Sequence, residues 1–562
     1  AMGKGALQSN VNGTDNTGLG CLALSATTSG SNNVAVGRSA LQTNTTGASN
    51  VGLGFQALYS NTTAANNSAL GHNALFNNTT GAENTAVGKS ALENNTTGAS
   101  NVALGAYALD ANTTGAGNIG IGVSALGANT TAAEGTGVGD GCLAVNTTGA
   151  LNTAFGAQTL AACTTGSSNV AIGGYALNDL TTGAENVAIG ALALDANTTA
   201  ANNVAVGVEA MTSNTTGTQN AAVGKAALAA NTTGSYNTAM GPYALNANTT
   251  ADSNTAVGWN SLSKNTTGTA NTGVGESALR NATTGDNNTG LGFSALGAAV
   301  VTGDGNTAVG TSALAANTSG ASNTAIGLGA LDANTTGYGN AGLGGGAGGA
   351  VTSGILNTFA GVDSGSACTT GSKNTILGRY SGNQGGEDIR TASNNIVLSD
   401  GDGNPRLIIN SSGRQTFGGG TATGHGNFVG EVGSSSKALM FEHTVGGGEV
   451  GSITTGSSST AYNTSSDYRL KENIEYTWDA TTRLKQLKPA RFNFILDETN
   501  TLVDGFIAHE AATVVPESVS GSKDAVDAEG NPDYQGIDQS KLIPLLVKTI
   551  QELEARITTL EG

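Results

Sequence analysis

Glycine recurs every 17 residues from Gly3 to Gly378, and this spacing constrains the fold of the chain more than any other feature. The series is unbroken to Gly292, passes one inserted residue near positions 298–301, and resumes at Gly310. A representative unit, residues 84–100, reads NTAVGKSALENNTTGAS. A fixed period of this kind is typical of repeat proteins, in which each unit packs against its neighbours in sequence. The spacing therefore predicts a stack of similar turns.

The apolar residues within each unit favour short strands over helices. An aliphatic residue precedes the anchor glycine, as Val87 does, and a leucine follows four residues after it, as Leu92 does. Two such side chains per unit are too few for an amphipathic helix, and the glycines and NTTG segments would break one. Strands stacked at ~4.8 Å place equivalent residues in ladders. We therefore predict a mainly β, parallel β-solenoid or β-roll shaft over residues 1–380, roughly 100 Å long, with both aliphatic ladders in a dry core.

Two polar features of the unit predict how its turns are held. Asparagine lies four residues before the anchor, as Asn84 and Asn101 do, and stacked amides can form hydrogen bonds from coil to coil. The NTTG segments, such as residues 95–98, predict corner turns in which glycine supplies a positive φ. They also match the N-glycosylation sequon, but a repeated turn produces that match automatically.

Composition and charge exclude several classes of function. The chain has 86 Gly, 11% charged residues and 4% aromatic residues, which is unlike an enzyme core. Its net charge of −18 disfavours nucleic acid and anionic membranes as partners. No apolar run approaches the ~20 residues that span a bilayer, so no membrane insertion is expected.

No cofactor or metal is expected either. The four cysteines lie far apart and at several repeat phases, without metal or disulfide spacing (Cys21, Cys142, Cys163 and Cys368). The start of a calcium loop at residues 400–404 lacks the loop glycine and the twelfth carboxylate, which favours a plain turn.

Beyond residue 380 the repeats degrade, and residues 381–465 are predicted to form a β-structured neck. Residues 394–414 read as two strands around a Gly/Pro/Asp turn, which indicates a hairpin. Residues 418–464 are rich in Gly and Ser with short apolar runs. The AVG and AIG units before the neck resemble the head repeats of trimeric autotransporter adhesins, although those repeats are usually shorter. That resemblance implies a parallel β-roll in which three chains pack together.

From Ser466 the composition changes to that of an ordinary globular domain, predicted to be α+β and to cover residues 466–562. The sequences SSDYRLKENI (465–474), LKQLKPARFNF (484–494), DGFIAHEAATVVPESV (504–519) and YQGIDQSKLIPLLVKTIQELEARI (534–557) follow in order. They resemble the endosialidase-type intramolecular chaperone, the self-cleaving domain that ends many phage tail spikes and tail fibres.

The resemblance implies that the domain assists trimer folding and then cuts the peptide bond before Ser466, with Ser466 and Lys471 as the catalytic pair. A serine hydroxyl needs a base, and a lysine can act as one if its pKa is lowered so that the neutral amine is available. The spacing of Ser466 and Lys471 alone favours a solvated loop serine and a surface lysine. Only the resemblance of the whole domain favours a catalytic pair instead. His509 reads as a packing residue and is left out of the pair.

The last segment is predicted to be a coiled-coil helix over residues 541–561. Its apolar residues are spaced three, four, three, four and three apart (Ile543, Leu546, Ile550, Leu553, Ile557 and Leu560), which is an a/d seam. Ile at a and Leu at d favour a parallel dimer in isolated coiled coils, whereas the resemblance implies a trimer. The run is under three heptads, and we follow the resemblance.

The sequence therefore predicts a homotrimeric structural fibre of a phage tail, located in the virion, that attaches to a host-surface receptor or glycan. Other tail or fibre proteins are candidate partners at its N-terminal end. The only enzymatic activity expected is self-cleavage, with no external substrate. The alternatives are a bacterial surface adhesin or extracellular fibre and, less favoured, a glycan-degrading tail spike, for which the scattered Asp and Glu residues offer no recurrent close pair.

Overall fold

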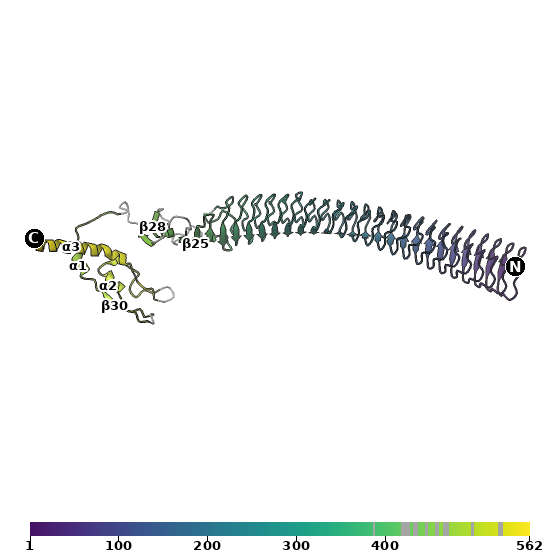
Figure 1. Ribbon diagram of the computed structural model, residues 1–562, viewed down its shortest axis with the longest axis horizontal. Helices are drawn as coiled ribbons and strands as arrows, with labels where there is room; N and C mark the ends of the chain where they lie inside the picture. The colour runs from purple at the N-terminus through teal and green to yellow at the C-terminus, as the bar shows by residue number, and fades with distance from the viewer. Residues whose placement is uncertain are drawn as a thin grey trace. The chain divides into compact units, whose positions relative to one another are not determined.

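A computed structural model describes residues 1–385, 388–417, 428–430, 437–443, 448–455, 460–464, 471–495, 499–526 and 532–562. The chain divides into two compact units, Ala1–Thr464 and Ser465–Gly562, and each is described by itself. The first unit contains the repeats, and Figure 1 shows their successive turns.

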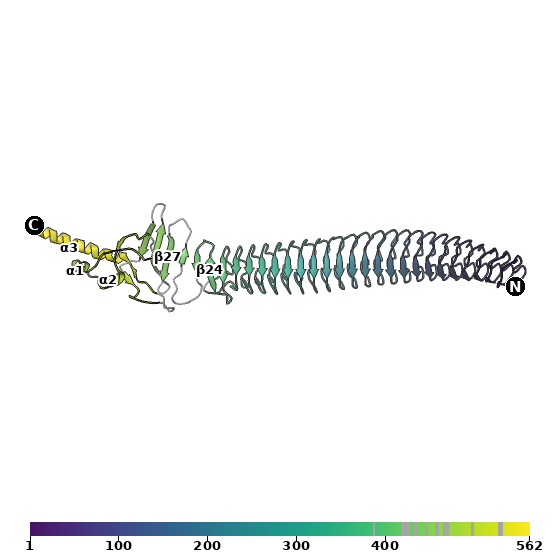
Figure 2. The same cartoon turned by 90° about the horizontal axis from the view of Figure 1, so that it is seen from below.

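Each turn of the first unit contributes one three-residue strand, and the strands pair in parallel along the row seen in Figure 2. Partners are 17 residues apart, as in Ile172 with Ile189, except at the predicted insertion, where Thr289 pairs with Thr307. The predicted parallel β-solenoid is confirmed. Its strands are β1 (Thr17–Leu19), β2 (Val34–Val36), β3 (Val51–Leu53), β4 (Ser68–Leu70), β5 (Thr85–Val87), β6 (Val102–Leu104), β7 (Ile119–Ile121), β8 (Thr136–Val138), β9 (Thr153–Phe155), β10 (Val170–Ile172), β11 (Val187–Ile189), β12 (Val204–Val206), β13 (Ala221–Val223), β14 (Thr238–Met240), β15 (Thr255–Val257), β16 (Thr272–Val274), β17 (Thr289–Leu291), β18 (Thr307–Val309), β19 (Thr324–Ile326), β20 (Ala341–Leu343), β21 (Thr358–Ala360) and β22 (Thr375–Leu377).

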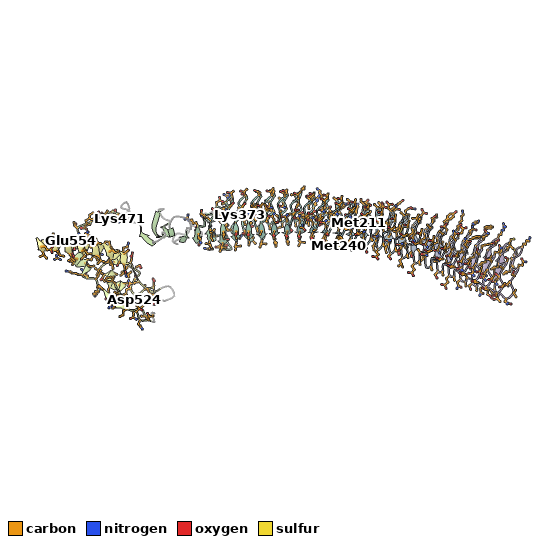
Figure 3. All side chains as sticks on the ribbon, viewed as in Figure 1. Met211, Met240, Lys373, Lys471, Asp524 and Glu554 are labelled. Carbon is orange, nitrogen blue, oxygen red and sulfur yellow. The ribbon has the colours of Figure 1, made fainter. Side chains whose placement is uncertain are left out.

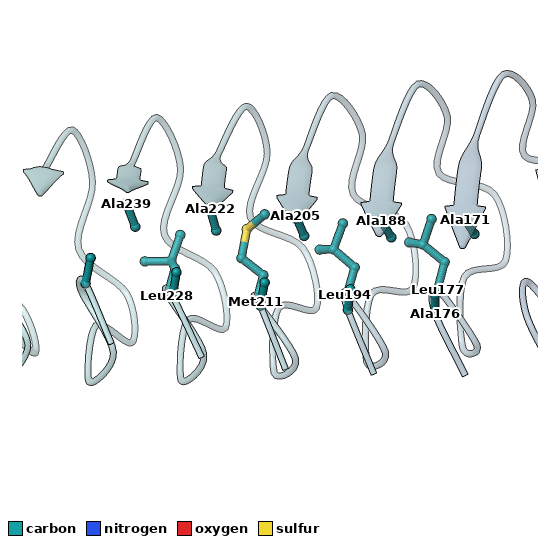
Figure 4. Close-up of a cluster of buried hydrophobic side chains, with 14 of the residues drawn as sticks. Ala171, Ala176, Leu177, Ala188, Leu194, Ala205, Met211, Ala222, Leu228 and Ala239 are labelled. Carbon is teal, nitrogen blue, oxygen red and sulfur yellow. The ribbon is translucent and has the colours of Figure 1, made fainter. Parts of the chain in front are cut away.

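The core of the solenoid is narrow and consists of two kinds of ladder. The middle residue of each strand, such as Ala171, faces inward, and the leucine of the following turn, such as Leu177, packs opposite it (Figure 4). Both are completely buried. The interior has little room at the middle position, because a Cβ on Gly120 would lie 3.2 Å from Leu109 Cγ in the preceding turn. Alanine or glycine therefore occupies this position in most strands.

The prediction that both aliphatic positions form the core is right for the leucine and wrong for the residue before the anchor glycine. Ile172 remains 40% exposed and Ile189 37% exposed. Side chains alternate between the two faces of a strand, so the residues on either side of the inward alanine must point outward. The second aliphatic ladder therefore lies on the outer face of the sheet.

The predicted asparagine ladder is confirmed and is accompanied by a second one. In the first, Asn50 Nδ2 donates to Asn33 Oδ1 at 3.1 Å and to the Ala64 carbonyl at 2.9 Å. In the second, the asparagine of the NTT segment does the same, as Asn61 Nδ2 donates to Asn44 Oδ1 at 2.9 Å. Both sets are buried, so the sequon asparagines serve as hydrogen-bonded core residues.

The prediction that the NTTG glycine supplies the positive φ is wrong. Positive φ is found instead at four positions of the unit: the anchor glycine (Gly88, 138°), the second residue after it (Ser90, 56°), the core leucine (Leu92, 52°) and the residue before the core asparagine (Ser100, 59°).

The solenoid ends in an antiparallel meander. β23 (Ile396–Ser399) still pairs in parallel with β22, and it forms the predicted hairpin with β24 (Pro405–Ile409). Asp400 closes the turn, since its Oδ1 accepts from the backbone N–H groups of Asp402 at 3.0 Å and Asn404 at 2.9 Å. The antiparallel strands β25 (Gln415–Phe417), β26 (Phe428–Gly430), β27 (Lys437–His443), β28 (Gly448–Thr455) and β29 (Thr460–Thr464) follow. The predicted β-rich neck is confirmed.

The second unit mixes short helices with two small antiparallel sheets, as predicted for an α+β domain. Its long helix α3 confirms the predicted C-terminal helix. The elements are α1 (Ala480–Leu484), β30 (Ala490–Phe492), β31 (Val503–Gly505), α2 (Ala508–Ala512), the 3₁₀ turn η2 (Pro516–Ser518), β32 (Val519–Ser520), β33 (Gly536–Ile537), the 3₁₀ turn η3 (Gln539–Leu542) and α3 (Ile543–Glu561).

Candidate self-cleavage site and the C-terminal unit

The C-terminal unit is organised around a small apolar cluster where α1 and α3 meet. Ala480 from α1, Val515 from the loop after α2 and Leu545 from α3 are at most 2% exposed. Trp478 and Phe506 pack against them. This cluster holds α1 and the segment around residues 514–515 against the start of α3.

A carboxylate of α3 anchors the start of α1. Glu552 accepts hydrogen bonds from the backbone N–H groups of Ala480 at 3.0 Å and Thr481 at 2.8 Å, and from Thr481 Oγ1 at 2.6 Å. The Thr481 hydroxyl, with the two backbone donors, lowers the pKa of Glu552 below its ordinary value. Asp479 caps the same helix by accepting from Thr482 N–H at 3.0 Å.

Arg483 joins α1 to the segment around η2. Its Nε donates to the Val514 carbonyl at 2.8 Å, and its Nη2 contacts both carboxylate oxygens of Glu517, at 2.8 and 3.1 Å. Sequence reasoning did not find this arginine or Glu552, because their partners lie 31 to 72 residues away.

The two residues of the predicted catalytic pair are not brought together by the part of the chain that the structure describes. Lys471 begins the described segment 471–495 and is exposed (Figure 3), whereas Ser466 lies outside the described residues. The Ser466–Lys471 pair therefore stays a prediction. His509, which was left out of that pair, lies on α2 and is half-buried.

Helix α3 has two different apolar faces. One face, with Leu545, belongs to the buried cluster of the unit. The other is the predicted a/d seam, which is exposed at all six positions (Ile543 56%, Leu546 45%, Ile550 63%, Leu553 44%, Ile557 53% and Leu560 87%). Within a single chain the seam has no covering element among the described residues.

Within the described ranges, no group of three or more His, Cys, Asp or Glu side chains is placed to hold a metal ion. Burial raises the pKa of the Cys142 thiol to about 12 and that of Cys163 to about 11. Among the helices that the structure describes, none has the length and apolar character needed to cross a membrane.

The fold defines the class as a repeat-built β-solenoid protein with a separate α+β domain at its C-terminal end. Residues 466–520 match the family model described as chaperone of endosialidase, so the chain carries a domain of that family. The resemblance predicted from the motifs is confirmed over this range, and the motif at 534–557 lies beyond it. No curated protein and no solved structure matches the chain.

Proposed function

We propose that this protein is a structural fibre of a phage tail, located in the virion, that attaches to a host-surface receptor or glycan. The observation that carries the proposal is the pairing of a solenoid of 22 parallel strands with a chaperone-of-endosialidase domain. The solenoid supplies length, at ~4.8 Å per turn, and needs no catalytic cleft. Binding of the labelled full chain to a panel of bacterial surface polysaccharides and outer-surface proteins tests attachment, and binding to none of them contradicts it.

The fibre is proposed to be a homotrimer whose assembly the C-terminal domain promotes. The exposed a/d seam of α3 supports this, because six apolar side chains in water are stabilised when other copies cover them. Pairing several long repeat arrays in one register is slow, and a terminal nucleus that sets the register first avoids misaligned association.

After assembly the domain is proposed to release itself by cutting the Ser465–Ser466 bond. Ser466 Oγ attacks the Ser465 carbonyl carbon while the Lys471 amine takes the hydroxyl proton, and that proton passes to the departing Ser466 nitrogen. The product is an ester between the Ser465 carbonyl and Ser466 Oγ. One water molecule hydrolyses this ester, leaving a carboxylate on Ser465 and a free hydroxyl and amine on Ser466.

Intact mass under denaturing conditions tests this chemistry. The unchanged chain should give two products divided before Ser466, and Ser466→Ala should stay whole because it has no nucleophile. Lys471→Arg should also stay whole, since an arginine keeps its proton. Ser465→Ala and Lys488→Arg are the matched controls and should divide as the unchanged chain does. Cleavage of Ser466→Ala, or an undivided unchanged chain after folding, contradicts the proposal.

A further inference from the structure

The outer face of the solenoid sheet is an unpartnered apolar strip. In every strand the first and third side chains point away from the core. The third is Val, Leu, Ile, Phe or Met in every strand from β1 to β22 except β21, which has Ala360. Many of these side chains are more than one third exposed (Leu19, Leu70, Leu104, Phe155, Ile172, Ile189, Val223, Met240, Leu291, Ile326, Leu343 and Leu377).

The strip also lacks charge. None of the outward positions of β1–β22 is Asp, Glu, Lys or Arg, and the first position is mostly Thr or Val. Charged side chains occur elsewhere on the same turns, for example Glu83 and Lys373 at the corner before the core asparagine. A sheet surface that faces water permanently usually carries charges, and parallel sheets are usually covered on both faces. The outer face therefore has the composition of a buried surface.

The strip is large enough for a specific interface. With 22 strands at ~4.8 Å per turn, and a three-residue strand about 10 Å long, its area is on the order of 1,000 Å². A stable interface needs about 800 Å² from each partner, and exposed apolar patches above a few hundred Å² mark interaction sites.

We propose that the outward face of β1–β22 is covered by the same face of other copies of this chain, in parallel and in register. A partner must match an uncharged apolar row that repeats at the β spacing along the whole strip, and an identical solenoid does so. The α3 seam, in the other unit, independently favours parallel copies. This inference rests on the proposed homotrimer and adds the surface through which the shafts associate.

Cross-linking of the full chain tests the surface. Starting from Cys21→Ser, which removes the one exposed thiol among the four cysteines, single cysteines are placed on the strip at Leu104, Ile189 and Ile326. A short bifunctional maleimide should join copies at all three positions. Cysteines at Leu151 and Leu356, exposed corner leucines off the sheet, are the controls and should give little product.

A charge variant provides the second measurement. Ile172→Lys with Ile189→Lys places two cations on neighbouring strands of the strip and should lower the unfolding midpoint of the β signal and remove the cross-links at Leu104 and Ile326. Leu151→Lys with Leu356→Lys makes the same charge change at the corner position where the chain itself has Lys373. This pair should change neither the unfolding midpoint nor the cross-links. If the lysine variant does not fold, Ile172→Thr with Ile189→Thr keeps β propensity and should give a smaller loss.

The outcomes separate this inference from the proposed homotrimer. Sedimentation of the unchanged chain as a single copy overturns both. A multimer that is cross-linked at the corners, or not at the strip, overturns the strip interface and leaves the homotrimer standing. An unfolding midpoint that neither lysine pair changes also overturns the strip interface, because the strip would then face water.

Discussion

At the scale of single residues, the anchor glycine is the most restricted position in the shaft. Gly207 has a φ of 142°, a backbone conformation that residues with a side chain rarely adopt, whereas Gly217 in the NTTG segment has no positive φ. The anchor position holds glycine in every turn from Gly3 to Gly378. The fourth position of the NTTG segment, by contrast, holds alanine at Ala64 and Ala200. The core leucines also have positive φ, which is unfavourable for a residue with a side chain, and their complete burial offsets that cost.

Gly207→Ala should therefore destabilise the shaft, by roughly 1–3 kcal/mol from the backbone conformation alone. Gly217→Ala, at the NTTG position of the same unit, is the control and should change the stability much less, because the chain places alanine at equivalent positions. Chemical denaturation followed by the β signal measures both. Equal losses in the two variants would contradict this account of the anchor.

The contacts of Glu552 make the C-terminal unit sensitive to acid. Because its pKa in the folded unit is lowered from the ordinary value of 4.5, its stabilising contribution is present above that pH and is lost as the pH falls through the lowered pKa. Glu552→Gln should lower the unfolding midpoint of the helical signal near pH 7 and weaken its dependence on pH below 4.5. Glu554→Gln, on an exposed position of the same helix, is the control, and an equal effect there would argue against the α1 contact.

At the scale of secondary-structure elements, helix α3 packs within its own unit on one face and presents the apolar a/d seam on another. Leu545 and Thr549 are buried within the unit, while the a/d seam stays exposed. Most of the stability of a helix in a protein comes from tertiary packing, so the packing of α3 against α1 holds it in place for association.

In the Ser466→Ala chain, which should keep its C-terminal unit, Ile550→Lys should lower the share of multimer formed on folding, as measured by sedimentation, because it places a charge in the centre of the seam. Gln551→Lys adds the same charge to the next residue, which is exposed and off the seam, and should leave the association unchanged. Loss of the multimer in both variants would indicate a general charge effect.

At the scale of the whole molecule, the solenoid is a one-dimensional stack in which each turn contacts its neighbours. The 18-residue step between β17 and β18 shows that the stack tolerates a local insertion. In the inserted turn, Val301 is buried where most turns have an asparagine, and it forms a parallel β-bridge with Ala282 in the preceding turn. Stability of such a stack is close to a sum over turns and their interfaces.

Deleting five complete turns, residues 102–186, should keep the fold and shorten the shaft by about 24 Å at ~4.8 Å per turn. Electron microscopy of the purified chain measures the length. A deletion of residues 102–178, which ends inside a turn, is the control and should misfold because it destroys the register of both asparagine ladders. An unfolded five-turn deletion would contradict independence of the turns.

The sequence alone determined the period, the parallel stack, the first asparagine ladder, the hairpin and the C-terminal helix, because each depends on spacing between near neighbours or equivalent positions. Its motifs also located the chaperone domain, while Ser466 and Lys471 stay a prediction. The tertiary structure decided which aliphatic ladder is inside, since Leu177 faces the core and Ile172 faces outward only once the path of the turn is known. It also placed the positive φ values and joined Glu552 to Thr481, because these depend on closed turns and on contacts between distant segments.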